Sequence, residues 1–463
     1  MQNLNSLKNQ VLEGEFIDKN CDIGNVHDDL KDPISVMAAY GHNIISVNKT
    51  FYLYEPSEGI WVAKSNTQMK KWLLTTHFRY QKNLPKINAI TDSIGLLSAH
   101  DKFPSYAKKE SVLVFRNCAV IPETRQISGF RADFYARERV NYDYDKNAPA
   151  PTKWLNFLEF VFEFDDDKND KIAFLRQYMG LSTTRIVNYQ VMVILLGGGS
   201  NGKSVILNIV QAMLGNDNVS NVSLSDFNQK FRVGQMENKL ANIDHDLGYK
   251  SIKNEAIFKA IVTGNRMINE RKFHDPAGFD PTAKLWAAGN YLPKVYNSTH
   301  AHYRRILPIT FNRTITESER NLTLLDELLA EIPSILNWAL DGLDILLKNK
   351  EFTIPASTRK ALADYKDEND PLERFMRENF EHLPDDASPR DGVLRGDFYI
   401  KYIKFFRDNG YSGLKLNDQM LLGKVLSDMN VKTKSSNGRR YYMVKQLPEI
   451  DADEISEKIG VGA

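Results

Sequence analysis

Cysteine is scarce in this sequence, and a long apolar run is missing altogether. The 463 residues include only two cysteines, Cys21 and Cys118. Two cysteines cannot complete a cysteine-rich zinc module and do not suggest a disulfide framework, so the chain fits a reducing compartment. No apolar stretch reaches membrane-spanning length, and the N-terminus MQNLNSLKNQ has no apolar signal-peptide core. We therefore expect a cytoplasmic protein with no membrane partner.

An excess of charge of one sign is also missing. Lysine and arginine total 60 and aspartate and glutamate total 59, which leaves a formal net charge of +1. A globally basic nucleic-acid binder is therefore excluded, and any contact with DNA has to come from local basic patches. The hydrophobic content of 42% and the charged content of 26% are ordinary for a globular protein.

The most informative stretch that is present is VMVILLGGGSNGKS, residues 191–204. Its apolar half predicts a buried strand, and Val205–Leu214 predicts a helix that ends at Gly215. Between them lies the pattern G-x-x-x-x-G-K-[ST], in which backbone N–H groups cradle phosphates and the following helix directs its positive end at them. We predict that ATP binds here, at Gly197, Gly198, Gly199, Ser200, Asn201, Gly202, Lys203 and Ser204.

Polar side chains of this loop and of a later strand predict the chemistry. A lysine at the position of Lys203 reaches the β- and γ-phosphates, and a serine at the position of Ser204 holds Mg²⁺. In KLANIDHDL, residues 239–247, an apolar strand leads to Asp244 and Asp246. One carboxylate would complete the magnesium site and the other would orient the attacking water. Side chains two apart on a strand share a face, so both acids are candidates for both roles.

Two further stretches add polar groups to this constellation. AKLWAAGN, residues 283–290, predicts a buried strand that ends at Asn290, whose amide would hold the lytic water or contact the γ-phosphate. HYRRILPITF, residues 302–311, places Arg304 and Arg305 directly before another apolar strand. An arginine from a neighbouring subunit stabilises charge on a transferring phosphoryl group. Taken alone, a Gly-Asn pair is usually a turn, and an Arg-Arg pair is usually solvated.

The order and spacing of these stretches resemble the superfamily 3 helicases, and in particular the poxvirus-type and satellite-phage-type primase-helicases of phages, plasmids and mobile islands. The resemblance covers roughly residues 50–447 and includes SLSDFNQKFRVGQMENKL before the acids. One departure is His245, which separates two acids that are adjacent in many family members. The resemblance implies an AAA+-like P-loop ATPase core, a homo-hexamer with ATP bound between subunits, and a bacterial host cytoplasm.

The organisation of the chain fits an α/β protein with several domains. From 186 to 312, strand-like and helical stretches alternate, which is typical of an α/β nucleotide-binding domain. We also expect a hairpin over 51–63 and a strand over 112–121. The predicted parts are an N-terminal α+β region of unclear role (1–110), a mostly helical domain (111–185), the AAA+-like ATPase domain (186–350), a winged-helix DNA-binding domain (371–447) and a flexible acidic tail (448–463).

The first expected DNA contact follows from the resemblance, because the family threads one DNA strand through its ring on basic hairpins. The matching stretch here is 264–285, where Met267–Phe273 would pair with Phe279–Leu285. The basic and aromatic residues expected at its tip, to grip phosphates and press on a sugar or base, are Arg271, Lys272, Phe273 and His274. An ordinary surface hairpin is the alternative.

A second basic hairpin is expected near the C-terminus. Residues 431–445, VKTKSSNGRRYYMVK, contain no acid, and Asn437-Gly438 is a strong hairpin signal. Helical stretches over 391–409 and 416–429 precede it, and helices followed by a basic hairpin look like a winged helix. We expect duplex phosphates to be contacted by Lys432, Lys434, Arg439 and Arg440. A wing that docks on a partner protein is the alternative.

These patterns together predict an ATP hydrolase with Mg²⁺ as cofactor. The function that the resemblance favours is a DNA helicase that unwinds duplex DNA during replication of a phage, plasmid or mobile element, with replication proteins as candidate partners. One alternative is an origin-binding initiator that melts or remodels DNA without processive unwinding. Another is a non-enzymatic module in which the loop binds nucleotide as a structural ligand. Turnover of ATP with and without single-stranded DNA separates the enzymes from the module.

Overall fold

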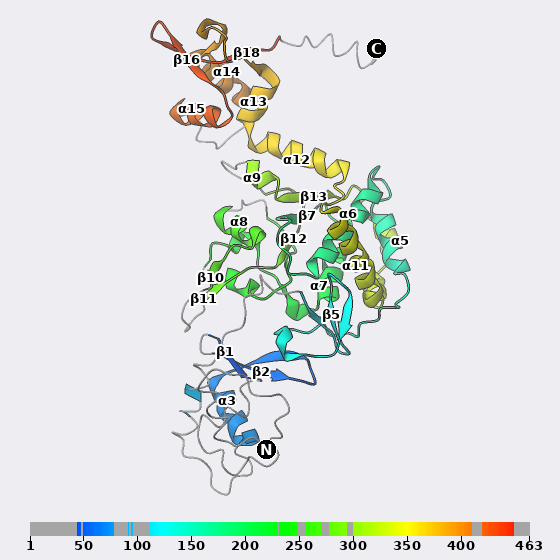
Figure 1. Cartoon of the computed structure of the whole chain (residues 1–463). Coiled ribbons are helices and arrows are strands. Elements are labelled where there is room, and N and C mark those ends of the chain that lie inside the picture. Colours follow the sequence, from blue (N-terminus) through cyan, green and yellow to red (C-terminus); the bar gives the residue numbers. More distant parts are fainter. Residues whose placement is uncertain are drawn as a thin grey trace. The chain divides into compact units, whose positions relative to one another are not determined.

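The chain forms two compact units in the computed structural model, one of residues 1–293 and 304–359 (unit 1) and one of residues 294–303 and 360–463 (unit 2) (Figure 1). The domain boundaries predicted from the sequence stay predictions. In the described part of the chain, no helix is both long and apolar enough to cross a membrane. The structure describes residues 44–47, 50–77, 91, 94–95, 111–229, 231–248, 255–269, 277–293, 300–409 and 419–448.

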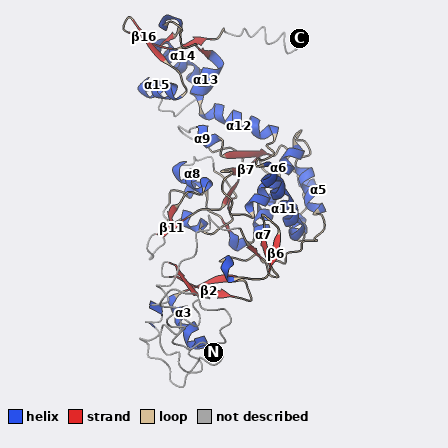
Figure 2. Ribbon diagram, viewed as in Figure 1, coloured by secondary structure: helices blue, strands red, loops and turns tan. Residues whose placement is uncertain are grey.

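Unit 1 is mixed α/β and is built around a parallel five-stranded sheet with the strand order β13-β7-β12-β9-β8 (Figure 2). Every residue of β9 and β12 is buried, and so are the first four residues of β7 and of β13. Such continuous apolar runs are typical of parallel strands covered on both faces. The expected α/β core is therefore present. Its strands are β7 (Met192–Leu196), β8 (Val219–Ser220), β9 (Ala241–Asp244), β12 (Lys284–Gly289) and β13 (Ile306–Thr310).

Helices cover the sheet of unit 1 on both sides. In Figure 1, α8 (Glu255–Thr263) lies on one side of the sheet, and most of the remaining large helices lie on the other. The predicted helix after the glycine-rich loop is confirmed, and it ends at Gly215, whose φ of +83° suits glycine. The helices on that other side are α5 (Thr152–Val161), α6 (Lys168–Ser182), α7 (Lys203–Leu214) and α11 (Ile332–Asn349), with the shorter α10 (Leu324–Leu329) before α11.

Two glycines allow α6 and α11 to pack very closely. A Cβ atom on Gly180 would lie 2.2 Å from the carbonyl oxygen of Ala339, and one on Gly342 would lie 2.4 Å from that of Arg176. Real Cβ atoms do not approach a backbone oxygen so closely, so any larger residue at either position would force the helices apart.

Small antiparallel sheets complete the described part of unit 1. The hairpin expected over 51–63 is confirmed by the pairing of β2 (Thr50–Glu55) with β3 (Ile60–Lys64). The single strand expected over 112–121 is wrong, because the polar pair Arg116–Asn117 turns the chain between two short strands. The remaining elements here are β1 (Ile44–Val47), α3 (Asn66–Trp72), β4 (Leu113–Val114), β5 (Ala119–Ile121) and β6 (Gln126–Ser128).

The predicted basic hairpin of unit 1 is shorter than expected. Strand β10 (Met267–Asn269) pairs with β11 (Ala277–Phe279) in antiparallel register. Lys284 and Leu285, expected in the second strand of this hairpin, belong to β12 of the central sheet instead. The reason is that both side chains are buried, so they suit an inner strand better than a surface hairpin.

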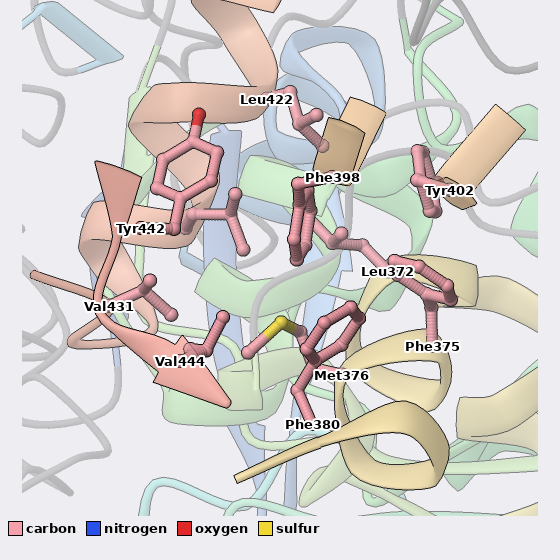
Figure 3. Close-up of a cluster of buried hydrophobic side chains, with 11 residues drawn as sticks. Leu372, Phe375, Met376, Phe380, Phe398, Tyr402, Leu422, Val431, Tyr442 and Val444 are labelled. Atoms are coloured by element: carbon pink, nitrogen blue, oxygen red, sulfur yellow. The ribbon is translucent and has the colours of Figure 1, made fainter. Parts of the chain in front are cut away.

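Unit 2 places helices around one apolar core and ends in short strands (Figure 3). Phe375 lies at the centre of this core, with the rings of Phe398, Tyr402 and Phe405 at centroid distances of 5.4, 5.4 and 5.1 Å. The elements are α9 (His300–Tyr303), α12 (Ala356–Asn369, which begins in unit 1), α13 (Pro371–Asn379), β14 (Phe380–His382), β15 (Val393–Leu394), α14 (Arg395–Asp408), α15 (Gln419–Asp428), β16 (Thr433–Ser436), β17 (Arg439–Tyr442) and β18 (Val444–Gln446).

The C-terminal hairpin forms where the sequence places it. Strands β16 and β17 pair across Asn437 and Gly438, which have φ angles of +52° and +73°. A two-residue turn with both φ angles positive matches the twist of the flanking strands, and Asn-Gly is the preferred pair for it. Strand β17 also pairs with β15, which gives a small sheet of order β15-β17-β16, while β14 pairs with β18.

Candidate nucleotide-binding site

The parallel sheet of unit 1 gathers several predicted site residues at one edge. Leu196, the last residue of β7, lies opposite Gly289 of β12, and Asp244 of β9 lies opposite Ala287. The glycine-rich loop, the first acid and Asn290 therefore all lie at or directly after the carboxyl ends of neighbouring strands, where open α/β sheets bind their ligands. The strand order brings these residues together although they are far apart in the sequence.

Glycine is required at several positions of the loop over residues 197–202. Gly199 and Gly202 have φ angles of +106° and +87°, which other residues rarely adopt. A Cβ atom on Gly202 would lie 2.9 Å from the side chains of both Phe157 and Val161, so packing also excludes a larger residue at this position. The loop is thus pressed against the end of α5 and turned so that it leads directly into α7.

Backbone hydrogen bonds fix the loop at its first residue and at its middle. The N–H of Gly197 donates to the carbonyl oxygen of Gly289 at 3.1 Å, which ties the loop to β12. The N–H of Ile315 donates to the carbonyl oxygen of Ser200 at 2.6 Å, which ties the loop to the segment after β13. No sequence pattern marked the segment after β13 as part of the site.

Lys203 is folded back into its own loop. Its side chain is largely buried, and the ammonium group donates to the carbonyl oxygen of Gly197 at 2.7 Å and to Oδ1 of Asn201 at 2.6 Å. Burial lowers the pKa of this lysine from its ordinary value. Both acceptors are neutral, so a bound triphosphate would offer the ammonium group charged oxygens in exchange. Ser204, one residue further, is exposed. The residues present therefore fit a phosphate group.

The two candidate acids occupy different environments. Asp244 is 7% exposed, whereas Asp246 is exposed. Oδ2 of Asp244 accepts hydrogen bonds from the N–H of Leu224 at 2.9 Å and from Oγ of Ser223 at 3.1 Å. Burial raises the pKa of Asp244, and these hydrogen bonds oppose that rise. A divalent cation beside this carboxylate would restore the charged form.

The expectation that both acids share one face of a strand is wrong. Strand β9 ends at Asp244, and the following residues form a bend. Asp244 is therefore held by the protein, while Asp246 is open to a ligand or to water. Ser223 and Leu224 were missed as partners of Asp244, since the stretch SLSDF gave no hint of which group it would bind.

Asn290 is exposed and directly follows β12, as expected. The arginines lie elsewhere. The N–H of Met192, at the start of β7, donates to the carbonyl oxygen of Arg305 at 2.7 Å, so Arg304 and Arg305 lie at the amino ends of the strands. The length of β13 separates them from the loop edge by about 16 Å, at about 3.3 Å per residue. These arginines do not reach the glycine-rich loop of their own chain.

Burial distinguishes the two arginines from each other. Arg305 is 4% exposed, and burial together with the charge of Arg304 lowers its pKa. Arg304 is exposed. Only Arg304 therefore presents its guanidinium group to another molecule without a rearrangement of the surrounding structure.

The expected DNA-contacting residues divide into two sets. Arg271, Lys272, Phe273 and His274 lie outside the described residues, between β10 and β11. In the C-terminal hairpin, Arg439 and Arg440 are exposed. The ammonium group of Lys432 pairs with Asp385 at 2.6 Å.

Lys434 is also engaged by its own unit. Its ammonium group donates to the backbone carbonyl oxygens of Asp385 and Ala387, each at 2.7 Å. Of the basic residues expected to contact phosphates on this hairpin, the two lysines are thus held by the loop over 385–387. The two arginines directly follow the turn at Asn437 and Gly438, and both are exposed.

Comparison with solved structures shows that the fold is shared with the C-terminal region of NrS-1. Two A-form apo structures of that region superpose with TM-scores of 0.51 and 0.53 at 12% identity, covering 87% and 90% of this chain and 96% and 100% of theirs. A further apo structure of NrS-1 residues 305–718 gives a TM-score of 0.52 at 10% identity, covering 89% of this chain and 99% of the other. At such low identity the likeness concerns the fold.

A sequence-family model also matches part of the chain. It is described as a family of unknown function (DUF5906) and aligns with residues 195–305. That range includes the glycine-rich loop, both acids, Asn290 and both arginines. A search of curated proteins found no match.

Proposed function

We propose that this chain is an ATP-dependent DNA helicase of the superfamily 3 type, which acts as a ring during the replication of a phage, plasmid or mobile element. The observation that carries the proposal is the meeting of a glycine-rich loop, a buried lysine and a buried carboxylate at one edge of a parallel sheet. A lysine and a carboxylate so placed suit a triphosphate with its magnesium ion.

Each polar group has a role in this proposal. The backbone N–H groups of residues 197–202 and the start of α7 would hold the phosphates, with Lys203 at the β- and γ-phosphates. Ser204 and Asp244 would hold Mg²⁺. Among the residues that the structure describes, no three His, Cys, Asp or Glu side chains gather as a metal site. This suits Mg²⁺, which is usually held by one or two carboxylates together with substrate phosphates.

Hydrolysis needs a water molecule oriented toward the γ-phosphate. Asp246 and Asn290 are both exposed at the loop edge, so either side chain would be accessible to that water. We assign Asp246 to activate the water and Asn290 to hold it or to contact the γ-phosphate. Asp244, whose carboxylate already accepts hydrogen bonds from Leu224 and Ser223, would stay with the magnesium ion.

The position of Arg304 supports a ring. Because it lies at the sheet edge opposite to the loop, its guanidinium group would complete the ATP site of a neighbouring subunit. A contact between two different faces of identical chains is heterologous, and heterologous contacts close into rings when the rotation allows it. We therefore propose a homo-hexamer with ATP at the subunit interfaces.

Two hairpins would contact DNA. The residues between β10 and β11, with Arg271, Lys272, Phe273 and His274, would hold a single strand in the channel of the ring. In unit 2, helices α13, α14 and α15 precede the hairpin β16–β17, which we propose to be the wing of a winged helix. Arg439 and Arg440 would contact duplex phosphates there, since both are exposed.

The test is turnover of ATP and strand displacement by the purified chain. We expect ATP hydrolysis that rises with single-stranded DNA and unwinding of a forked duplex, and we expect Lys203→Ala to abolish both. Lys348→Ala is the matched control, because Lys348 is exposed at the end of α11, on the surface of the same unit. Hydrolysis that persists in Lys203→Ala would refute the proposed site.

A second comparison tests the channel hairpin and separates the helicase from its rival. Lys272→Ala should keep basal hydrolysis and lose both unwinding and single-strand binding. Unwinding at the parent's rate would show that this hairpin is not the channel element. Distortion of duplex DNA without strand displacement by the parent chain would favour an origin-binding initiator, to which the C-terminal hairpin is equally suited.

A further inference from the structure

An exposed aromatic ring near the glycine-rich loop has no part in the function proposed above. Phe164, in the connection between α5 and α6, is 67% exposed. An exposed aromatic ring beside a candidate ligand site offers a flat apolar face on which a ligand ring can stack. The guanidinium carbon of Arg313 lies 5.0 Å from the centroid of this ring.

The side chain of Arg313, which lies against the ring of Phe164, is itself held by several contacts. The side chain of Arg313 is 8% exposed and lies between two rings, with its guanidinium carbon 3.8 Å from the centroid of Phe160. Its guanidinium nitrogens pair with Glu163 and, at 2.6 Å, with Glu319. A cation that is stacked and ion-paired in this way holds the ring of Phe164 in a defined position.

Both segments that carry this platform touch the glycine-rich loop. On the α5 side, Phe157 and Val161 pack against Gly202, where a Cβ atom would be 2.9 Å from each. On the β13 side, the segment that contains Arg313 donates the Ile315 N–H to the carbonyl oxygen of Ser200 at 2.6 Å. The platform therefore lies beside the predicted phosphate site and within the same unit.

We infer that Phe164 is the surface on which the base of a bound nucleoside triphosphate stacks. The inference rests on the proposed function, because the phosphates would have to lie in the loop. Stacking on the open face of the ring would remove apolar surface from water, while the opposite face stays on Arg313. Every base has a π-face, so stacking alone discriminates little among bases. The site would accept other nucleoside triphosphates as well as ATP, and it would bind them more tightly than bare polyphosphate.

The test compares ATP with magnesium tripolyphosphate, which has the phosphates but no base. Binding of each ligand to the full chain is measured by titration calorimetry for the parent, Phe164→Ala and Phe164→Tyr. We expect Phe164→Ala to weaken ATP on the order of ten-fold, as for loss of one base–aromatic stack, and to leave tripolyphosphate unchanged. Phe164→Tyr keeps the ring and should bind ATP like the parent.

Several outcomes overturn the inference. The inference is wrong if Phe164→Ala binds ATP as tightly as the parent does. It is also wrong if Phe164→Ala loses the same factor in affinity for ATP and for tripolyphosphate. Tyr291 is also 67% exposed and follows Asn290 at the same edge, so a loss of ATP binding in Tyr291→Ala alone would place the base there instead. A parent that binds tripolyphosphate as tightly as ATP refutes the platform but keeps the phosphate site. A parent that binds neither ligand refutes the proposed function as well.

Discussion

Arg304 lies too far from its own glycine-rich loop to act there, so in the proposed ring its removal should disable the ATP site of the next subunit. The separation of about 16 Å follows from the length of β13 at about 3.3 Å per residue. An arginine that completes a phosphoryl-transfer site contributes on the order of 10³-fold or more to kcat. Both Arg304→Ala and Lys203→Ala should therefore be nearly inactive when assayed alone.

A mixture of the two inactive variants should regain activity. An Arg304→Ala subunit has an intact loop, and a Lys203→Ala subunit has an intact arginine. Random mixing in equal amounts pairs an intact loop with an intact arginine at about one quarter of the interfaces of any closed heterologous ring. ATP hydrolysis should therefore recover to about one quarter of the parental rate per subunit, as each such interface is complete in itself.

The assay is steady-state phosphate release at fixed total protein, after the variants are mixed under dissociating conditions and allowed to reassemble. Arg320→Ala is the matched control, since Arg320 is an exposed arginine of the same unit, and it should keep parental activity alone. If the mixed variants hydrolyse ATP no faster than the sum of their separate rates, the site is not shared between subunits. Full activity of Arg304→Ala as a monomer would also refute the shared site.

Further outcomes test stability and DNA contact. Lys284 is buried, and burial lowers its pKa to about 7, from 10.5 for an ordinary lysine. Between pH 7 and pH 10.5 the unfolded chain binds more protons at this lysine than the folded chain. The free energy of unfolding of the parent should therefore rise by roughly a few kcal/mol from pH 7 to pH 9 relative to that of Lys284→Met, measured by urea unfolding. An equal pH response of both chains would contradict the lowered pKa of Lys284. Gly342→Ala should lower the free energy of unfolding by about 1–3 kcal/mol, because it forces α6 and α11 apart, while Gly396→Ala, with open space around it, should not. Arg440→Ala should reduce the salt dependence of duplex binding by about one phosphate contact. Lys434→Ala should reduce it less, because the ammonium group of Lys434 already donates to backbone carbonyl oxygens. Fluorescence anisotropy at several salt concentrations measures this dependence, and an unchanged slope for Arg440→Ala would show that Arg440 does not contact the duplex.

Local sequence determined the elements whose conformation depends on near neighbours. The glycine-rich loop could be located because only glycine readily adopts the positive φ angles found at Gly199 and Gly202. The C-terminal turn was predictable for the same reason, from Asn437 and Gly438. Apolar periodicity located α7 and the buried strands, because burial on one or both faces leaves its spacing in the sequence.

Tertiary structure decided how the predicted side chains are used. Asp244 differs from Asp246 because its carboxylate accepts a hydrogen bond from Leu224, which is 20 residues away in the chain. Arg304 lies just before β13, and β13 runs parallel to β7, so Arg304 lies at the edge opposite to the loop. No local pattern contains the relative direction of the two strands. Contacts between distant segments depend on which strands become neighbours, so residue spacing predicts which groups are present but not which groups meet.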